Sequence, residues 1–207
     1  MKSLLSIARW IDVVNVKVGR GISWAILLVV LVSTGNALAR KFLHSGSNAW
    51  LELQWYLFGA LFLLASGYTL LKNGHVRVDV LSSKLTPRKR IAVEIFGTLF
   101  FLMPAAVLIM VLAWPMAWES WATQEMSPNS GGLIRWPAKL LVPVGFTLLI
   151  AAGISHLIKC IGFLRGECPD PTERESSMSD EEKLAAELQA RLEAEDAAAA
   201  AGKVREH

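Results

Sequence analysis

The stretch Lys72–Arg90, KNGHVRVDVLSSKLTPRKR, is a basic loop between two apolar segments, each long enough to cross a bilayer. It has a single anion, Asp79, and six cations: Lys72, Arg77, Lys84, Arg88, Lys89 and Arg90. Short loops this rich in Lys and Arg stay in the cytoplasm, because moving them across the membrane is unfavourable. Placing this loop on the cytoplasmic side therefore assigns a side to every other segment.

The composition around this loop is that of an integral membrane protein. The 207 residues are 53% hydrophobic, and the charges gather in the first twenty residues, the central loop and the C-terminal tail, leaving four long apolar blocks. The net charge of +3 does not predict nucleic acid binding, because the cations flank apolar segments, where they set topology and contact anionic membrane lipid. Cys160 and Cys168 are expected to be reduced thiols, outside any metal site.

Four membrane-spanning helices are predicted, over about residues 21–39, 50–71, 91–114 and 139–164. Each block has roughly 19 to 26 residues, enough to cross the hydrocarbon core at about 1.5 Å per residue with some tilt. Pro104 predicts a kink in the third block, because it removes a backbone hydrogen bond. The small residues NALA at 36–39 resemble a signal-peptide cleavage site, but the long charged lead and long apolar run favour an uncleaved helix.

Both ends of the chain are predicted to add helices outside the spans. In residues 1–20, apolar positions 4, 7, 11, 14 and 18 predict an amphipathic helix on the inner membrane surface; the alternative is an irregular basic lead-in. Residues 165–207 are predicted to be a cytoplasmic linker followed by an Ala/Glu-rich helix over 179–201, opened by a capping box at Ser179 and Glu182. The predicted fold class is therefore an all-α integral membrane protein with four transmembrane helices, an N-terminal amphipathic helix and a cytoplasmic C-terminal helical tail.

The Lys and Arg distribution predicts the orientation. With the N-terminus inside, the inner segments carry four cations in residues 1–20, six in residues 72–90, and Lys159 and Arg165 around the end of the fourth span. The outer loops carry only Arg40 and Lys41, then Arg135. Every loop agrees, so both termini are predicted to be cytoplasmic.

The predicted outer loop over residues 114–136 is rich in tryptophan. Trp114, Trp118 and Trp121 recur at helical spacing, so the third helix either continues outward or lies along the interface. Two interpretations of the tryptophans stay open. They form an aromatic belt that only anchors the hairpin, or a surface on which a partner protein packs.

No catalytic, cofactor or metal site is predicted, and the chain is not expected to be an enzyme. Only His156 among the four histidines lies within a span, so a haem would need a second ligand from a partner. Phosphate loops, paired Cys motifs and nucleophile elbows are missing. Glu52, Glu94, Lys139 and Lys159 lie near span ends, where snorkelling makes them tolerable, and interhelical hydrogen bonds account for Asn36 and His156.

Three segments, in order along the chain, carry a family resemblance: WLELQWYL at 50–57, YTLLKNGHVRVDV at 68–80 and PNSGGLIRWPAK at 128–139. Together they resemble the small membrane subunit of tripartite ATP-independent periplasmic (TRAP) transporters, the DctQ-like family. The form is closest to the branch associated with mannitol, chloroaromatic and 2-oxo acid uptake. The resemblance covers about residues 9–165 and leaves out the tail.

The resemblance implies a subunit of a bacterial inner-membrane importer that takes up organic acids on an ion gradient, with sodium the expected ion. Its partners would be a large multi-span permease subunit, which it braces, and a periplasmic substrate-binding protein, which docks partly on it. The predicted structural or partner-contact residues are Glu52, His75, Arg77, Asp79, Arg135, Trp136 and Lys139. Arg77 and Asp79 are expected to pair locally or with the large subunit, whereas Arg135, Trp136 and Lys139 are expected to contact a partner on the outer side.

Two other classes of membrane protein remain as alternatives. A self-contained four-helix transporter working as an oligomer relies on a membrane-embedded carboxylate in its first helix, and residues 21–39 contain none. A membrane anchor of a redox complex would need a haem ligand pair or an extramembrane domain, and the tail is too short for a domain.

Overall fold

The computed structural model describes residues 2–44, 46–74, 86–171 and 188–189. The chain divides into two units, Met1–Thr172 and Glu173–His207. In the second unit the structure describes only residues 188 and 189, which are helical, so most of the tail helix predicted over 179–201 lies outside the described residues. Within the described ranges, every regular element is a helix.

Four helical stretches are long and apolar enough to cross a membrane, which confirms the predicted all-α membrane fold. The first joins α1 and α2, and the third joins α5, a π-helical turn η1 and α6. The elements in chain order are α1 (Lys2–Ser23), α2 (Ala25–Phe42), α3 (Asn48–Leu71), α5 (Pro87–Gly97), η1 (Thr98–Leu102), α6 (Met103–Ala122) and α7 (Trp136–Leu164).

The third and fourth spans are longer than the sequence predicted. The third begins at Pro87 and continues through Trp114 to Ala122, and the fourth begins at Trp136 and not at 139. Both starts place a proline in the first turn, where a helix needs no donor from that residue. Of the two alternatives for the tryptophan-rich segment, the helix that continues outward is therefore the one observed.

The distortion predicted at Pro104 takes the form of a π-helical turn. Residues 98–102 are π-helical, and the backbone N–H of Met103 donates to the carbonyl of Thr98, five residues earlier. Proline has no N–H to offer the carbonyl four residues before it, so the α-helical ladder is interrupted at this point. A π turn is one of the ordinary ways in which a helix takes up such an interruption.

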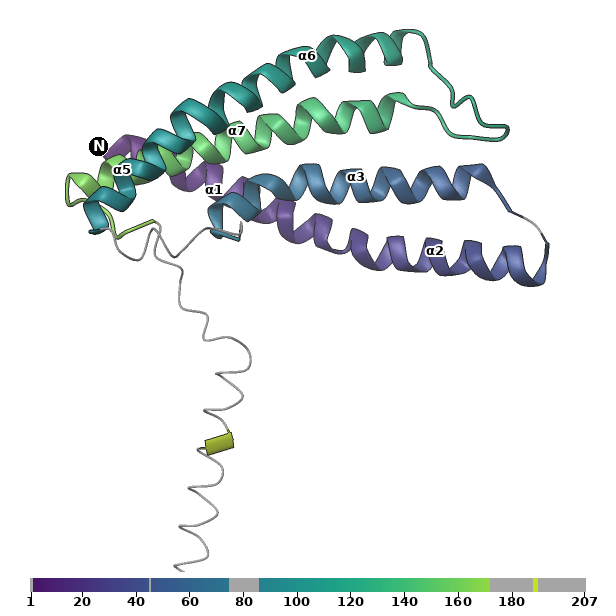
Figure 1. The fold of residues 1–207 in the computed structure, drawn as a ribbon, viewed down its shortest axis with the longest axis horizontal. Coiled ribbons are helices and arrows are strands. Elements are labelled where there is room, and N and C mark those ends of the chain that lie inside the picture. The colour runs from purple at the N-terminus through teal and green to yellow at the C-terminus, as the bar shows by residue number, and fades with distance from the viewer. Residues whose placement is uncertain (1, 45, 75–85, 172–187, 190–207) are drawn as a thin grey trace, which may run out of the picture. The chain divides into compact units, whose positions relative to one another are not determined.

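The four spans lie in a row in the order α2, α3, α7, α6 (Figure 1). Among the described residues, the substantial contacts between these four helices join only neighbours in the row, while α1 also packs on α3 and α7. Of the four spans, α7 has the largest buried share, because it lies between α3 and α6 and also contacts α1 and α5. The row leaves large apolar side chains exposed along α2 and α6.

Glycines allow close approach within the row. A Cβ atom on Gly145 of α7 would lie 2.7 Å from the Leu63 Cβ of α3. A Cβ atom on Gly67 of α3 would lie 2.1 Å from the Asn15 Oδ1 of α1 and 3.0 Å from the Leu148 carbonyl oxygen of α7. Three helices therefore meet at Gly67, which has no room for a side chain.

The N-terminal helix predicted over residues 1–20 is present as α1, but it packs through a different face from the one its apolar pattern suggests. Ala8, Asn15 and Gly19 are buried against α3 and α7, whereas Leu4 and Ile7 of the apolar stripe are 46% and 52% exposed. Small residues form this contact because they let helix backbones approach closely. The large apolar residues are left free for lipid.

Candidate functional site

The predicted outer side of the molecule corresponds to one end of the row, called here the tryptophan end. It consists of the end of α6, the starts of α3 and α7, and the connection over residues 123–135, with Trp50, Trp118, Trp121 and Trp136. Four of the predicted site residues, Glu52, Arg135, Trp136 and Lys139, lie here.

The connection between α6 and α7 is a small ordered hairpin. Met126 and Ile134 form an antiparallel bridge, the Ser127 N–H donates to the Leu133 carbonyl at 3.0 Å, and the Arg135 N–H donates to the Glu125 carbonyl at 2.8 Å. At the tip, Gly131 has a φ of +71°, a conformation that suits glycine. This hairpin over residues 125–135 gives the end of the row a defined shape.

Glu52 of α3 holds the hairpin in place. Its side chain accepts hydrogen bonds from the Ser127 hydroxyl, from Asn129 Nδ2 at 2.8 Å and from the Leu133 N–H at 2.7 Å. The residue is only 5% exposed, so the expectation that Glu52 snorkels to water is wrong. Loop donors replace water around the carboxylate, which satisfies it inside the fold.

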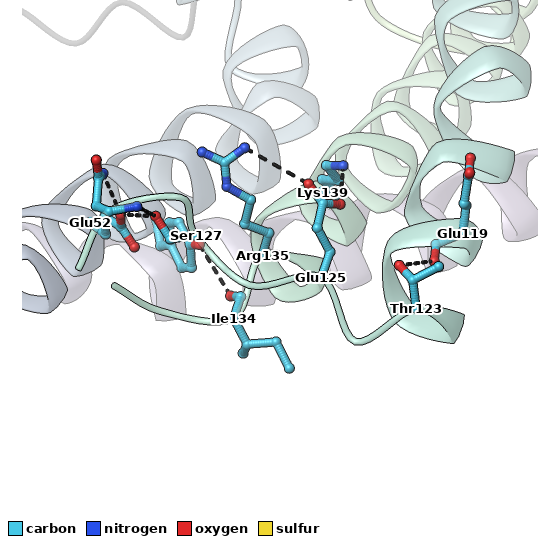
Figure 2. Close-up of polar contacts among 10 residues, drawn as sticks. Glu52, Glu119, Thr123, Glu125, Ser127, Ile134, Arg135 and Lys139 are labelled. Atoms are coloured by element: carbon cyan, nitrogen blue, oxygen red, sulfur yellow. Dashed lines mark hydrogen bonds and ion pairs between the residues drawn. The ribbon is translucent and has the colours of Figure 1, made fainter. Parts of the chain in front are cut away.

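Two further residues of α3 bind the same hairpin. The Tyr56 hydroxyl donates to the Ile134 carbonyl at 3.1 Å, and Asn48 Nδ2 donates to the Ser130 carbonyl at 2.9 Å (Figure 2 draws the Ile134 contact). The segment 50–57 and the segment 128–139, two of the three that carry the family resemblance, are therefore in direct contact. Sequence reasoning did not pair them, because 75 or more residues separate Glu52 from its loop partners.

Arg135 and Lys139 converge on Glu125 (Figure 2). Lys139 Nζ makes a short ion pair with Glu125 Oε2, and Arg135 Nη1 lies 3.8 Å from Glu125 Oε1. The hydrogen bond from Lys139 is the main cause that holds the pKa of Glu125 below its ordinary value. Lys139 is thus engaged within the chain, while the Arg135 side chain, 42% exposed, stays open to a partner.

Trp136 lies beside an apolar groove between α6 and α7. The groove has a volume of about 240 Å³ and is lined by Trp114, Ala117, Trp118, Trp121, Trp136 and Leu140. The rings of Trp118 and Trp121 are 5.0 Å apart between centroids. The aromatic cluster therefore forms one surface next to the polar hairpin.

A second set of polar contacts lies at the opposite end of the row, called here the basic end, near Lys72, Arg88, Lys89, Arg90 and Arg165. Asp12 of α1 accepts a hydrogen bond from Ser155 and pairs with Lys159, both on α7. Sequence reasoning missed Asp12. The residue could have been found from the helical spacing of Ala8, Asp12, Asn15 and Gly19, which places these small and polar residues on one face of α1.

The other polar residues of the basic end also have partners. His156 Nε2 lies 3.5 Å from Glu94 Oε2 and 3.6 Å from Cys160 Sγ, and Arg90 pairs with Asp170. The predicted site residues His75, Arg77 and Asp79 lie outside the described residues. Among the residues that the structure does describe, no group of three or more His, Cys, Asp and Glu side chains is arranged to hold a metal ion.

Comparison with known proteins gives one match. The family model described as tripartite ATP-independent periplasmic transporters, DctQ component, matches residues 29–162, more than half of the 207 residues. Neither the curated proteins nor the solved structures include a match to the chain.

Proposed function

Because the chain belongs to the DctQ family, a family of transporter components and not of enzymes, we propose that it braces the large transport subunit of a TRAP importer. In this role the chain is the small membrane subunit, and a periplasmic substrate-binding protein delivers the solute. The importer takes up organic acids on an ion gradient, with sodium as the coupling ion. The proposed substrates are those of the branch associated with mannitol, chloroaromatic and 2-oxo acid uptake.

The row of spans is the observation that carries this proposal. Among the described residues, α2, α3, α7 and α6 contact one another in that order, and α1, the first part of the first span, also packs on α3 and α7. The exposed sides of α2 and α6 are lined by large aliphatic and aromatic residues, including Leu27, Leu31, Leu108 and Leu112. Such a layer suits a protein that widens a neighbouring membrane protein, since its sides are available for lipid and partner.

Sidedness is the second part of the proposal. The charge distribution favours a cytoplasmic basic end and cytoplasmic termini, which puts the tryptophan end on the periplasmic side of the inner membrane. The hairpin held by Glu52, with Arg135, Trp136 and Lys139 beside it, then faces the binding protein or the large subunit. A fixed shape favours docking, because less conformational entropy is lost on binding.

The selective chemistry is assigned to the partners. The large subunit carries the ion and substrate sites, while His75, Arg77 and Asp79 lie in the proposed cytoplasmic loop, away from solute that arrives from outside. Arg77 and Asp79 pair locally or with the large subunit and thereby fix the cytoplasmic connection between the second and third spans.

Reconstitution tests this function. The large subunit and its binding protein are placed in proteoliposomes with a sodium gradient, with and without this chain, and uptake of labelled 2-oxo acids is measured. We expect uptake only when the chain is present in a stable complex with the large subunit. Transport by this chain alone, bound haem, or full uptake without it would each contradict the proposal.

A further inference from the structure

Asn36 is a buried amide near the outer end of the first span. It lies on α2 and is only 7% exposed. Its side chain makes no hydrogen bond to any residue in the described part of the chain, although the sequence suggested a bond to a neighbouring helix. An amide has two donor hydrogens and an oxygen acceptor, and hydrocarbon offers a partner to none of them.

The amide borders a groove between α2 and the start of α3. The groove has a volume of about 450 Å³ and is lined by Leu31, Val32, Gly35, Asn36, Ala39, Ser47 and Trp50. A Cβ atom on Gly35 would contact nothing, so the backbone of α2 is open at this point. Beside Leu31 and Val32, which also line it, this patch of Gly35, Asn36 and Ala39 interrupts an exposed surface of α2 that consists mainly of large aliphatic side chains such as Ile26, Leu27 and Val30.

The patch fits a helix better than it fits lipid. Acyl chains pack well on large aliphatic side chains but leave an amide without a hydrogen bond. Transmembrane helices, by contrast, pack on small residues four positions apart, as Gly35 and Ala39 are, and polar side chains such as Asn bond across that contact. The flank of α2 is also open, since among the described residues α2 contacts only α3 and the adjoining α1 to any extent.

We propose that this groove seats a transmembrane helix of the large transport subunit, which carries a hydroxyl or amide side chain that hydrogen-bonds to Asn36. The inference rests on the proposed function and identifies the side of the row that binds the partner. It assigns the interface to the face of the row between α2 and α3 and leaves the α6 flank to lipid.

Matched variants of one helix test the interface. Asn36→Leu removes the amide at similar size, and Gly35→Leu fills the groove. Ala37→Leu adds the same bulk on the other side of α2, since two residues turn a helix by about 200°. Each tagged chain is co-expressed with the large subunit, and the amount of large subunit that co-purifies is measured.

We expect at least fivefold less large subunit with Asn36→Leu and Gly35→Leu, and no change with Ala37→Leu, at equal amounts of chain in the membrane. Equal recovery with all three variants would overturn the inference while leaving the proposed function intact. If the unchanged chain itself recovers no large subunit, the proposed function fails first.

Cross-linking separates the possible occupants. In a chain without its native cysteines, Ala39→Cys is treated with a bifunctional thiol reagent in the native membrane. We expect an adduct with the large subunit. An adduct with a second copy of the chain, or bound phospholipid in the groove with no adduct, would overturn the inference.

Discussion

Glu52 accepts hydrogen bonds from three groups of one hairpin, and two of these bonds end on the same oxygen, Oε1. A single side chain of α3 thereby fixes the connection between α6 and α7. The sequence offered Glu52 as a polar residue near a span end, but the partners could not be predicted, because donors in a distant loop have no periodic relation to the helix. Glu52 is buried because these loop donors replace water around its carboxylate.

Replacing Glu52 by Gln should loosen the hairpin. The amide keeps the size of the side chain but turns one acceptor oxygen into a donor, which then faces the donors of Ser127 and Asn129 or of Leu133. We expect faster proteolysis within residues 123–135 and a lower Tm in detergent. The matched control is Glu119→Gln, an exposed residue near the same end of α6, which should change neither quantity. Unchanged cleavage in Glu52→Gln would contradict the role of the carboxylate.

Glu125 gives the hairpin a dependence on pH. Its pKa is lowered from 4.5, so the bond with Lys139 stabilises the folded hairpin fully above that value. The stabilisation is lost as pH falls through the lowered pKa. Hydrogen exchange of the Arg135 N–H should therefore speed up on acidification below about 4.5, beyond the intrinsic pH effect. In Glu125→Gln this extra step should be missing; if it persists, another group causes it.

The helices themselves were predictable, because long apolar runs bounded by charged residues decide where spans lie. Their order in the row was not. A span that is apolar all round has no stripe that marks its buried side, so the sequence of α6 or α7 does not tell which neighbour it meets. In α1, where a stripe exists, its residues are exposed or half-buried, and the small face with Ala8 and Gly19 packs.

The three-helix contact at Gly67 can be tested by adding one methyl group. In Gly67→Ala the new Cβ would overlap Asn15 Oδ1 and press on the Leu148 carbonyl, so the buried Asn15 amide and the backbone of α7 must shift. We expect a loss of about 1–3 kcal/mol in the free energy of unfolding, the usual range for overpacking. Denaturant titration of the purified protein measures it.

Gly59 provides the control on the same helix. A Cβ atom at Gly59 meets nothing within 4 Å, and alanine forms helices better than glycine. Gly59→Ala should leave stability unchanged or slightly raised. Equal effects of the two substitutions would show that helix propensity, and not the contact, sets the outcome.

At the scale of the whole molecule, Arg135 of the tryptophan end is a partly exposed cation that a partner can reach. Arg135→Gln removes its charge, while Glu125 keeps its ion pair with Lys139, so the hairpin should stay folded. If the binding protein docks here, uptake should slow several-fold with no loss of assembled complex. Arg40→Gln, in the last turn of α2, should have little effect. Unchanged uptake in Arg135→Gln would place the docking surface elsewhere.

Helices standing side by side in a single layer have an inherent weakness, which is that neighbours can slide along their common axis. The helical stretch formed by α1 and α2 contacts both α3 and α7 and therefore opposes such sliding. It runs beside α3 through α2, passes the end of α3 at Gly67 and Tyr68, and is fastened to α7 by the Asp12 contacts with Ser155 and Lys159. Sliding α3 past α7 would have to break these Asp12 contacts or bend the chain at Trp24, the residue between α1 and α2. These contacts oppose sliding of the helices within the layer, which is what the proposed bracing role requires.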